Sequence, residues 1–305
     1  METAYRCGYV GVLGQTNVGK STFLNAVMGQ KLLITSAKPQ TTRNRVRCVL
    51  TTEEAQIIFV DTPGLHRPQN TLGRHILRQA FQAVRGLDVL LYMVEPWRTV
   101  SDYDSALLSR LTRQDLPMLL LVNKIDLARG NDLEETLIAY EATGRFCELI
   151  PISAREATNL DEALRTLLSY LPERKAYFPS EVRIDRPEEF LISELIREKI
   201  IRLAYQEIPY TTATRVKWLR EREDGVLEIR AEILVERESQ KGIIIGKGGR
   251  MIKRIGSLAR AEIESLLGTR VFLDLIVKVQ RGWSRDLDQI KQLAGGDLPG
   301  QVGER

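Results

Sequence analysis

Eight residues near the start of the chain constrain its fold more than any other segment. Residues 14–21 have the sequence GQTNVGKS, which fits the pattern G-x-x-x-x-G-K-[ST]. The apolar run Tyr9–Leu13 before them is typical of a buried strand, and the segment after them is typical of a helix. Glycines let a backbone wrap closely around an anion, and the N–H groups at a helix start point toward it. This context therefore predicts a phosphate-binding P-loop.

The P-loop also predicts which residues meet a nucleotide. Lys20 is expected to neutralise the β- and γ-phosphates and to act in catalysis, and the Ser21 hydroxyl is expected to hold Mg²⁺. A chance match to the pattern occurs in roughly one chain of this length in a hundred, so the companion motifs below decide the matter. The predicted nucleotide contacts in this segment are Gly14, Gln15, Thr16, Asn17, Val18, Gly19, Lys20, Ser21 and Thr22.

Composition and charge set the broad class of protein. The chain of 305 residues is long enough for two domains, and its net charge of +4 permits an anionic partner without requiring one. Three widely separated cysteines, Cys7, Cys48 and Cys147, predict neither a metal site nor a disulfide framework and are typical of a reducing cytosol. With no signal-peptide pattern and no apolar stretch of bilayer length, the sequence indicates a cytoplasmic protein.

Residues 5–170 alternate between strand-like and helix-like segments. This alternation predicts an α/β domain with a mostly parallel sheet and helices on both faces. The expected strands are Tyr9–Leu13, Val46–Leu50, Ile57–Val60, Val89–Val94, Met118–Val122 and Glu148–Ile152. The expected helices lie near residues 20–29, 73–85, 103–113, 133–143 and 159–170.

The pattern changes after a proline-containing stretch. We predict a first domain over residues 1–171, a linker over 172–187, a second domain over 188–290 and a tail over 291–305 whose composition is typical of disorder. The second domain has the expected order α-β-β-α-α-β, which indicates a small α+β fold. Its segments are Ile192–Ala204, Thr212–Leu219, Val226–Val235, Gly242–Ile245, Met251–Leu267 and Arg270–Val279. Trp218, Phe272 and Trp283 are expected in its core or groove wall, and none is assigned a base.

A second nucleotide motif follows the strand Ile57–Val60. Asp61, Thr62, Pro63 and Gly64 fit D-x-x-G, in which the aspartate reaches the Mg²⁺ shell. The Gly64 N–H is expected to meet the γ-phosphate and to contribute to catalysis. Alone this motif is weak, but downstream of a P-loop and at the end of an apolar strand it strongly favours a nucleotide site over a plain strand-to-turn aspartate.

A third motif selects the base. Asn123, Lys124 and Asp126 end the strand Met118–Val122, and a carboxylate at Asp126 can accept the two N–H groups on the edge of guanine. Adenine offers no such pair, so the motif predicts GTP and not ATP. The alternative for Asp126 is a helix N-cap. Ser153 and Ala154 follow the strand Glu148–Ile152, where a backbone N–H can contact guanine O6.

The loop between the first two motifs contains two adjacent threonines, Thr41 and Thr42. One of them should reach Mg²⁺ when the γ-phosphate is present, which would make residues 37–45 a switch that GTP orders and hydrolysis releases. We favour Thr42 as the metal ligand and as a catalytic residue. The alternative is ordinary turn polarity, and the loop alone would prove nothing.

These motifs, with Gln40-Thr41-Thr42-Arg43 as the switch, resemble the Era/TrmE-like branch of the translation-factor class of GTPases. The resemblance implies that Asn17 helps to bind a K⁺ ion where an arginine finger would otherwise sit; the alternative is a hydrogen bond that stabilises the loop. Leu65 follows the D-x-x-G motif where Ras-like proteins carry a glutamine. The chain therefore lacks the usual side chain that positions the attacking water.

The second domain carries a glycine-rich loop, Gly246-Lys247-Gly248-Gly249. G-x-x-G between two apolar helices is typical of KH domains, where it clamps the backbone of single-stranded nucleotides. Residues 241–260 contain six Lys or Arg and no Asp or Glu, which favours a nucleic-acid face over a solvated helix face. The predicted RNA contacts are Lys241, Gly246, Lys247, Gly248, Gly249, Arg250 and Lys253.

A GTPase domain followed by a type II KH domain resembles the Era family of bacterial GTPases from residue 5 to about residue 290. The resemblance implies GTP hydrolysis, binding of the 3′ end of small-subunit ribosomal RNA by the KH domain, and maturation of the small ribosomal subunit by a monomer. Two alternatives stay open. Leu65 permits an RNA-holding protein with negligible turnover, and the basic face permits peripheral association with the inner face of the cell membrane, although no amphipathic anchor is evident.

Overall fold

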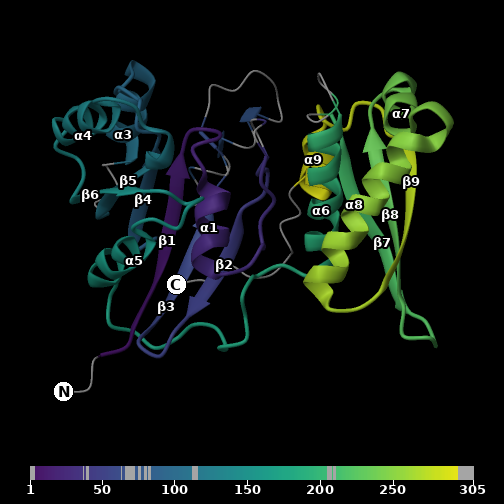
Figure 1. Ribbon diagram of the computed structural model, residues 1–305, viewed down its shortest axis with the longest axis horizontal. Coiled ribbons are helices and arrows are strands. Elements are labelled where there is room, and N and C mark those ends of the chain that lie inside the picture. Colours follow the sequence, from purple (N-terminus) through teal and green to yellow (C-terminus); the bar gives the residue numbers. More distant parts are fainter. Residues whose placement is uncertain are drawn as a thin grey trace. The chain divides into compact units, whose positions relative to one another are not determined.

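The computed structural model describes residues 4–36, 38, 41–62, 64–65, 73–74, 77–78, 81, 84–111, 116–204, 208 and 211–294. Several predicted positions lie outside the described residues: residues 37, 39 and 40 of the predicted switch, Pro63, residues 75–76, 79–80 and 82–83 of the predicted helix 73–85, residues 112–113 of the predicted helix 103–113, and residues 295–305 of the predicted tail. The chain forms two compact units (Figure 1). The first comprises residues 1–33, 45–67 and 77–185, and the second comprises 34–44, 68–76 and 186–305.

The first unit is built on one six-stranded sheet with the order β2-β3-β1-β4-β5-β6. Its strands are β1 Arg6–Gly14, β2 Val46–Thr51, β3 Ala55–Asp61, β4 Val89–Val94, β5 Met118–Asn123 and β6 Glu148–Ile152. All neighbours pair in parallel except β2, which runs antiparallel to β3. Every residue of β4 and β5 is buried, as expected for parallel strands that are covered on both faces. The predicted mostly parallel sheet is confirmed.

Helices cover both faces of this sheet (Figure 1). They are α1 Lys20–Met28, α3 Asp102–Leu111, α4 Asp132–Glu141 and α5 Leu160–Ser169. Adjacent strand residues point to opposite faces, and β3 shows the consequence. Phe59 meets Phe23 of α1 with ring centroids 6.1 Å apart, whereas Val60 shares a buried cluster with Leu108 of α3.

Residues 172–185, predicted as a linker, pack against the first unit. The fully buried Gln56 accepts hydrogen bonds from the Tyr177 and Phe178 N–H groups at 2.8 and 2.9 Å. Val49 of β2 donates its N–H to Arg183 O at 2.9 Å. A buried side chain and an edge strand therefore order a segment whose own sequence contains no helix or strand signal.

The second unit has the element order α-β-β-α-α-β that the sequence predicts. Its elements are α6 Glu188–Leu203, β7 Ala213–Glu221, β8 Leu227–Val235, α7 Glu238–Ile245, α8 Arg250–Leu267 and β9 Val271–Val279. The sheet order is β7-β8-β9, with β7 antiparallel and β9 parallel to β8. In α8, Ile255, Ala259 and Ile263 lie four residues apart and form one fully buried stripe in the core of this unit.

A further helix, α9 Leu287–Ala294, was not predicted, and it includes the first four residues of the segment expected to be tail. Its Ile290 packs with the fully buried Trp283, whose indole N–H donates to Thr211 O at 3.1 Å. The other two aromatic residues expected in the core or groove wall are not core residues, because the exposed fractions of Trp218 and Phe272 are 37% and 47%.

Candidate nucleotide site and nucleic-acid loop

Backbone geometry makes two P-loop glycines irreplaceable. Gly14 ends β1 with φ of 149°, and Gly19 caps α1 with φ of 101°. A Cβ on Gly14 would lie 2.4 Å from Met93 O, and one on Gly19 would lie 2.2 Å from the Asn123 side-chain nitrogen. Only glycine fits both the backbone angles and the space.

Lys20 is the buried cation of this loop. Its ammonium donates to Gly14 O at 3.1 Å and to Gln15 O at 2.8 Å, and the residue is only 6% exposed. Burial lowers the pKa of Lys20 to about 8, while the nearby Asp61 carboxylate acts in the opposite direction. An ammonium held in this way can exchange its carbonyl partners for phosphate oxygens.

The D-x-x-G segment touches the P-loop directly. Leu65 donates its N–H to Gly14 O at 3.0 Å, and the buried Thr62 hydroxyl donates to Val12 O at 2.7 Å. A Cβ on Gly64 would lie 2.7 Å from the Thr16 methyl carbon, so this glycine permits the close approach.

The side chains present fit a magnesium ion. Ser21 supplies a hydroxyl and Asp61 a fully buried carboxylate, and oxygen is the ligand that Mg²⁺ prefers. No group of three or more His, Cys, Asp or Glu that could hold a metal ion occurs among the residues that the structure describes. The remaining ligands would therefore be phosphate oxygens and water, as is usual for Mg²⁺ at nucleotide sites.

The third motif is bonded to the P-loop and to the Ser153-Ala154 pair. Asn123 donates its side-chain amide to Val18 O at 2.8 Å and accepts from the Ala154 N–H at 2.9 Å. Lys124 donates to Asn17 O at 2.7 Å. Side chains at the end of β5 and directly after it thus join segments that are more than 100 positions apart in the chain.

Asp126 presents an exposed carboxylate beside this network. One of its oxygens accepts a hydrogen bond from the Ser153 hydroxyl at 2.6 Å, and Ser153 is fully buried. An acceptor-only group in a fixed orientation suits the paired N–H donors of guanine.

Sequence reasoning missed two carboxylates that support the motif residues. Glu95 contacts the Lys124 ammonium at 2.5 Å. The buried Asp104 accepts from the Gln15 side-chain amide at 2.9 Å, the Tyr92 hydroxyl at 3.1 Å and the Ser101 hydroxyl at 2.6 Å. Glu95 directly follows β4, a position at the carboxyl edge of the sheet that could have pointed to it. Asp104 carries no such signal.

Thr42 lies in segment 34–44, which belongs to the second unit. Thr35 donates its N–H to the Glu198 carboxylate of α6 at 3.0 Å, and Arg43 donates to Thr212 O at 2.9 Å. Arg197 donates to the carbonyl of Thr41, next to Thr42. The proposed switch is therefore bonded to the second unit on both sides of its threonine pair.

The second glycine-rich loop joins α7 to α8. Gly246, Gly248 and Gly249 have φ of 73°, 61° and 74°. A Cβ on Gly248 or Gly249 would meet nothing within 4 Å, so their outer side is open. Lys247, Arg250 and Lys253 are exposed around the loop, and Lys241 is half-buried on α7. The start of α8 adds N–H donors to this cationic surface.

Comparisons with known families match two parts of the chain. Residues 9–124 match a family described as 50S ribosome-binding GTPase, and residues 207–284 match the KH domain family. The GTPase Era of Geotalea uraniireducens is 43% identical over 291 residues, which cover 95% of this chain and 98% of the relative. The GTPase Era of Geobacter metallireducens is 43% identical over 293 residues, covering 96% and 98%.

Two solved structures are also similar over nearly the whole chain. One is a variant of Aquifex aeolicus Era bound to GDP and AlF4⁻, with a TM-score of 0.90 and 36% identity. The other is Era in complex with MgGDPNP and nucleotides 1506–1542 of 16S ribosomal RNA, with a TM-score of 0.89 and 36% identity. Each covers 94% of this chain and 98% of the other.

Proposed function

Because the chain belongs to the Era family of GTPases, we propose that it binds and hydrolyses GTP and that its KH domain holds the 3′ end of small-subunit ribosomal RNA during maturation of the small ribosomal subunit. The observation that best supports GTP binding is that the side chains of Asn123 and Lys124 donate hydrogen bonds to the P-loop carbonyls of Val18 and Asn17. These bonds hold the base-selecting motif and the phosphate-binding loop in one frame. A relative solved with 16S ribosomal RNA supports the RNA half.

Hydrolysis in this site rests on positioning and electrostatics. When bound, Mg²⁺ would supply positive charge that offsets the negative charge developing on the phosphates. Ser21, Asp61 and Thr42 are the proposed protein ligands of the ion. Lys20 adds a positive charge at the same phosphates, and the Gly64 N–H donates to the γ-phosphate. Since segment 34–44 is bonded to α6, any movement of Thr42 toward the nucleotide would change hydrogen bonds of the second unit.

Leu65 is 1% exposed and cannot orient water, so additional positive charge near the transferred phosphoryl group becomes important. We propose a K⁺ ion held with the help of Asn17, which has a left-handed φ of 67°. Hydrolysis should be faster in KCl than in NaCl at equal ionic strength, and Asn17→Leu should remove the difference. Equal rates in both salts for the wild type would contradict the K⁺ site. Negligible turnover in KCl with RNA present would favour an RNA-holding protein over a GTPase.

Replacement of Asp126 tests base selection. Asp126→Asn replaces one carboxylate oxygen with an amide that donates, so GTP affinity should fall and xanthosine triphosphate should bind in its place. Asp161→Asn, which changes an exposed aspartate at the start of α5, should leave both affinities unchanged. Calorimetry with the two nucleotides measures the effect. Unaltered GTP affinity in Asp126→Asn would show that the assignment is wrong.

The RNA half is tested by crosslinking the protein to small-subunit ribosomal RNA and mapping the joined nucleotide, which we expect near the 3′ end. We further propose that the protein works as a monomer in the cytoplasm. None of the helices in the described part of the chain combines the length and apolar character that a membrane crossing requires. Co-sedimentation with anionic vesicles that an RNA competitor fails to reverse would favour peripheral membrane association.

A further inference from the structure

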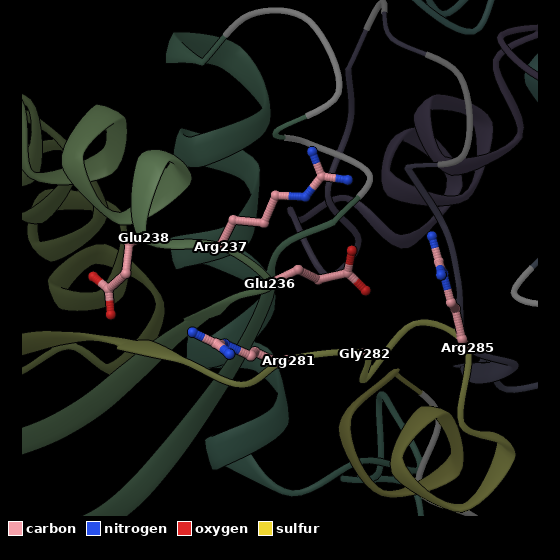
Figure 2. A pocket seen from close by; sticks show the side chains of 6 residues that line it. All are labelled: Glu236, Arg237, Glu238, Arg281, Gly282 and Arg285. Atoms are coloured by element: carbon pink, nitrogen blue, oxygen red, sulfur yellow. The ribbon is translucent and has the colours of Figure 1, made fainter.

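A hollow of about 380 Å³ opens in the second unit, away from the G-x-x-G residues. Three arginines and two glutamates account for most of its lining, as Figure 2 shows. The full lining is Glu236, Arg237, Glu238, Arg281, Gly282 and Arg285. Its volume lies near the lower end of the about 300–1,000 Å³ that small-ligand sites span, a size suited to a single nucleotide unit.

The sheet creates this hollow. Strands β8 and β9 are parallel and end opposite one another, with Val235 paired to Val279. The chain that leaves β8 supplies residues 236–238, and the chain that leaves β9 supplies residues 281–285. Ligand sites in sheets with parallel strands tend to form beyond such carboxyl ends, where two connections diverge.

Partly buried hydrogen bonds hold the two walls in fixed positions. Gln240, only 3% exposed, accepts from the Glu236 and Arg237 N–H groups at 2.9 and 3.1 Å. Glu236 accepts from the Ser284 hydroxyl at 2.6 Å and thereby links one wall to the other. The arginine side chains rise from this fixed base, and Arg237, Arg281 and Arg285 are all exposed.

Helix α7 connects the hollow to the proposed RNA loop. Arg237 precedes the first residue of this eight-residue helix, and Gly246 follows its last residue. At a rise of 1.5 Å per residue the two ends are about 12 Å apart. A strand whose roughly four nucleotides are clamped at the loop can reach this far with the nucleotides next to them.

We propose that this hollow is a second RNA subsite, which takes a nucleotide adjacent to those clamped by the Gly246–Gly249 loop. Arg281 and Arg285 would bind the phosphates, because guanidinium groups form paired hydrogen bonds with phosphate oxygens. Glu236 and Glu238 accept hydrogen bonds and would meet the amino groups of a base or a ribose 2′-hydroxyl. This inference rests on the proposed function of the KH domain.

The two glutamates favour RNA over other anionic partners. They reduce the net charge of the lining to one positive unit, the excess of three arginines over two glutamates. A dense anionic surface such as a lipid bilayer would bring many negative charges against these carboxylates. A nucleotide within a strand brings only the phosphates on its two sides together with hydrogen-bond donors, and it therefore matches both kinds of side chain.

The test compares RNA length in matched variants of the full chain. Single-stranded RNAs from the 3′ end of 16S ribosomal RNA are lengthened stepwise in both directions from the roughly four nucleotides that a KH loop clamps. Wild type is compared with Arg281→Ala/Arg285→Ala and with Arg270→Ala, an exposed arginine just before β9 at the opposite end of that strand. GTP affinity and circular dichroism verify that each variant is folded.

We expect all three proteins to bind the shortest RNA alike. Longer RNAs should bind about tenfold more tightly to the wild type and to Arg270→Ala, and the double variant should lose this gain, as expected for loss of about 1.4 kcal/mol. Its salt dependence should become shallower by up to about 1.4 in the slope of log K against log salt, because each lost phosphate contact contributes about 0.7.

Two results overturn the inference and leave the proposed function intact. One is equal length dependence and equal salt slope in the wild type and the double variant. The other is loss of binding to phosphatidylserine vesicles in the double variant while its RNA binding is unchanged, which would assign the hollow to a membrane. If Lys247→Asp/Gly248→Asp also binds RNA like the wild type, the RNA site does not lie at the Gly246–Gly249 loop, and the proposed role of that loop fails separately.

Discussion

The molecule contains two glycine-rich loops, each before a helix, and they are built in opposite ways. In the P-loop, a Cβ on Gly14 or Gly19 would lie closer than 3 Å to another part of the protein. In the second loop, a Cβ on Gly246 would lie 2.7 Å from the Met251 Cβ, but one on Gly248 or Gly249 would meet nothing within 4 Å. Glycine permits close internal packing in the P-loop, whereas Gly248 and Gly249 leave an open approach for an external backbone.

The charged groups of the two loops show the same contrast. Lys20 is buried and bonded to two carbonyls of its own loop, whereas Lys247 projects into solvent. Asn123 and Asp104 also fix the P-loop from outside. The nucleotide site is therefore arranged before its ligand arrives, while the proposed RNA loop would gain most of its contacts from the RNA.

Substitution of Gly19 should give the largest effect among the tests of this difference between the two loops. Gly19→Ala places a methyl group against Asn123, which must move and give up its bonds to Val18 O and from Ala154 N–H. Lost buried hydrogen bonds and a strained φ should lower the unfolding free energy by about 3 kcal/mol or more. GTP binding should be lost, as measured by calorimetry beside thermal denaturation.

Gly29→Ala is the matched control, because Gly29 has a φ of 65° and nothing within 4 Å of an added Cβ. This substitution should lower the unfolding free energy only by the cost of the left-handed backbone, about 1–2 kcal/mol, and GTP affinity should be unchanged. If both substitutions changed the unfolding free energy and the GTP affinity equally, close packing around Gly19 would not be the reason why this position requires glycine.

Charge reversal in the second loop should affect RNA without affecting the fold. Lys247→Asp/Gly248→Asp places two negative side chains where phosphates must approach, so affinity for single-stranded ribosomal RNA should fall about ten- to hundredfold. GTP affinity without RNA should be unchanged. Lys217→Asp/Gly225→Asp makes the same changes at an exposed lysine and an open, left-handed glycine elsewhere in the second unit. If both double variants lose RNA affinity equally, the loss reflects general charge and not the loop.

The features that could be predicted from the sequence are those that depend on residues close together in the chain. The P-loop, D-x-x-G and guanine motifs have fixed spacings because each is a short turn at the end of a strand, and the structure brings all three together. The strand order of the first unit along the chain and the α-β-β-α-α-β order of the second were predicted for the same reason, since apolar periodicity is a local signal.

Contacts between distant residues were not predictable in this way. Asp104 supports Gln15 across 89 positions, and nothing in the helix that carries it marks this role. Segment 34–44 follows the first-domain helix α1 in sequence, yet it bonds to α6 more than 150 positions later. Helix α9 was not predicted because its position depends on the packing of Ile290 against the buried Trp283, and the sequence does not show that these two residues meet.

Titration of Lys20 offers a smaller test of the buried loop, in nucleotide-free and metal-free protein. Its pKa is lowered from 10.5 to about 8, so between these values the unfolded chain binds more protons than the folded one. The unfolding free energy should therefore rise with pH through this window, by an amount on the order of 1 kcal/mol between pH 7 and pH 9. Denaturant unfolding of wild type and Lys20→Met across this range measures the rise. An identical pH dependence in both proteins would place the lysine in solvent in the free protein.

The smallest effect is expected at an ion-pair cluster of the second unit in which the Arg220 and Arg222 side chains are 69% and 37% exposed. Hydrogen bonds from Arg222 and Arg220 lower the pKa of Glu228 from 4.5 to about 2. The stabilisation by this carboxylate is present above pH 4.5 and is lost as the pH falls from 4.5 toward 2. Glu228→Gln should therefore raise the pH of acid unfolding slightly in low salt, and high salt should remove most of the difference, because exposed ion pairs are screened. Glu223→Gln, in the turn of the same hairpin, is the control. A shift that persists in high salt would mean that this ion-pair cluster is shielded from solvent, and its contrast with the buried Lys20 would then fail.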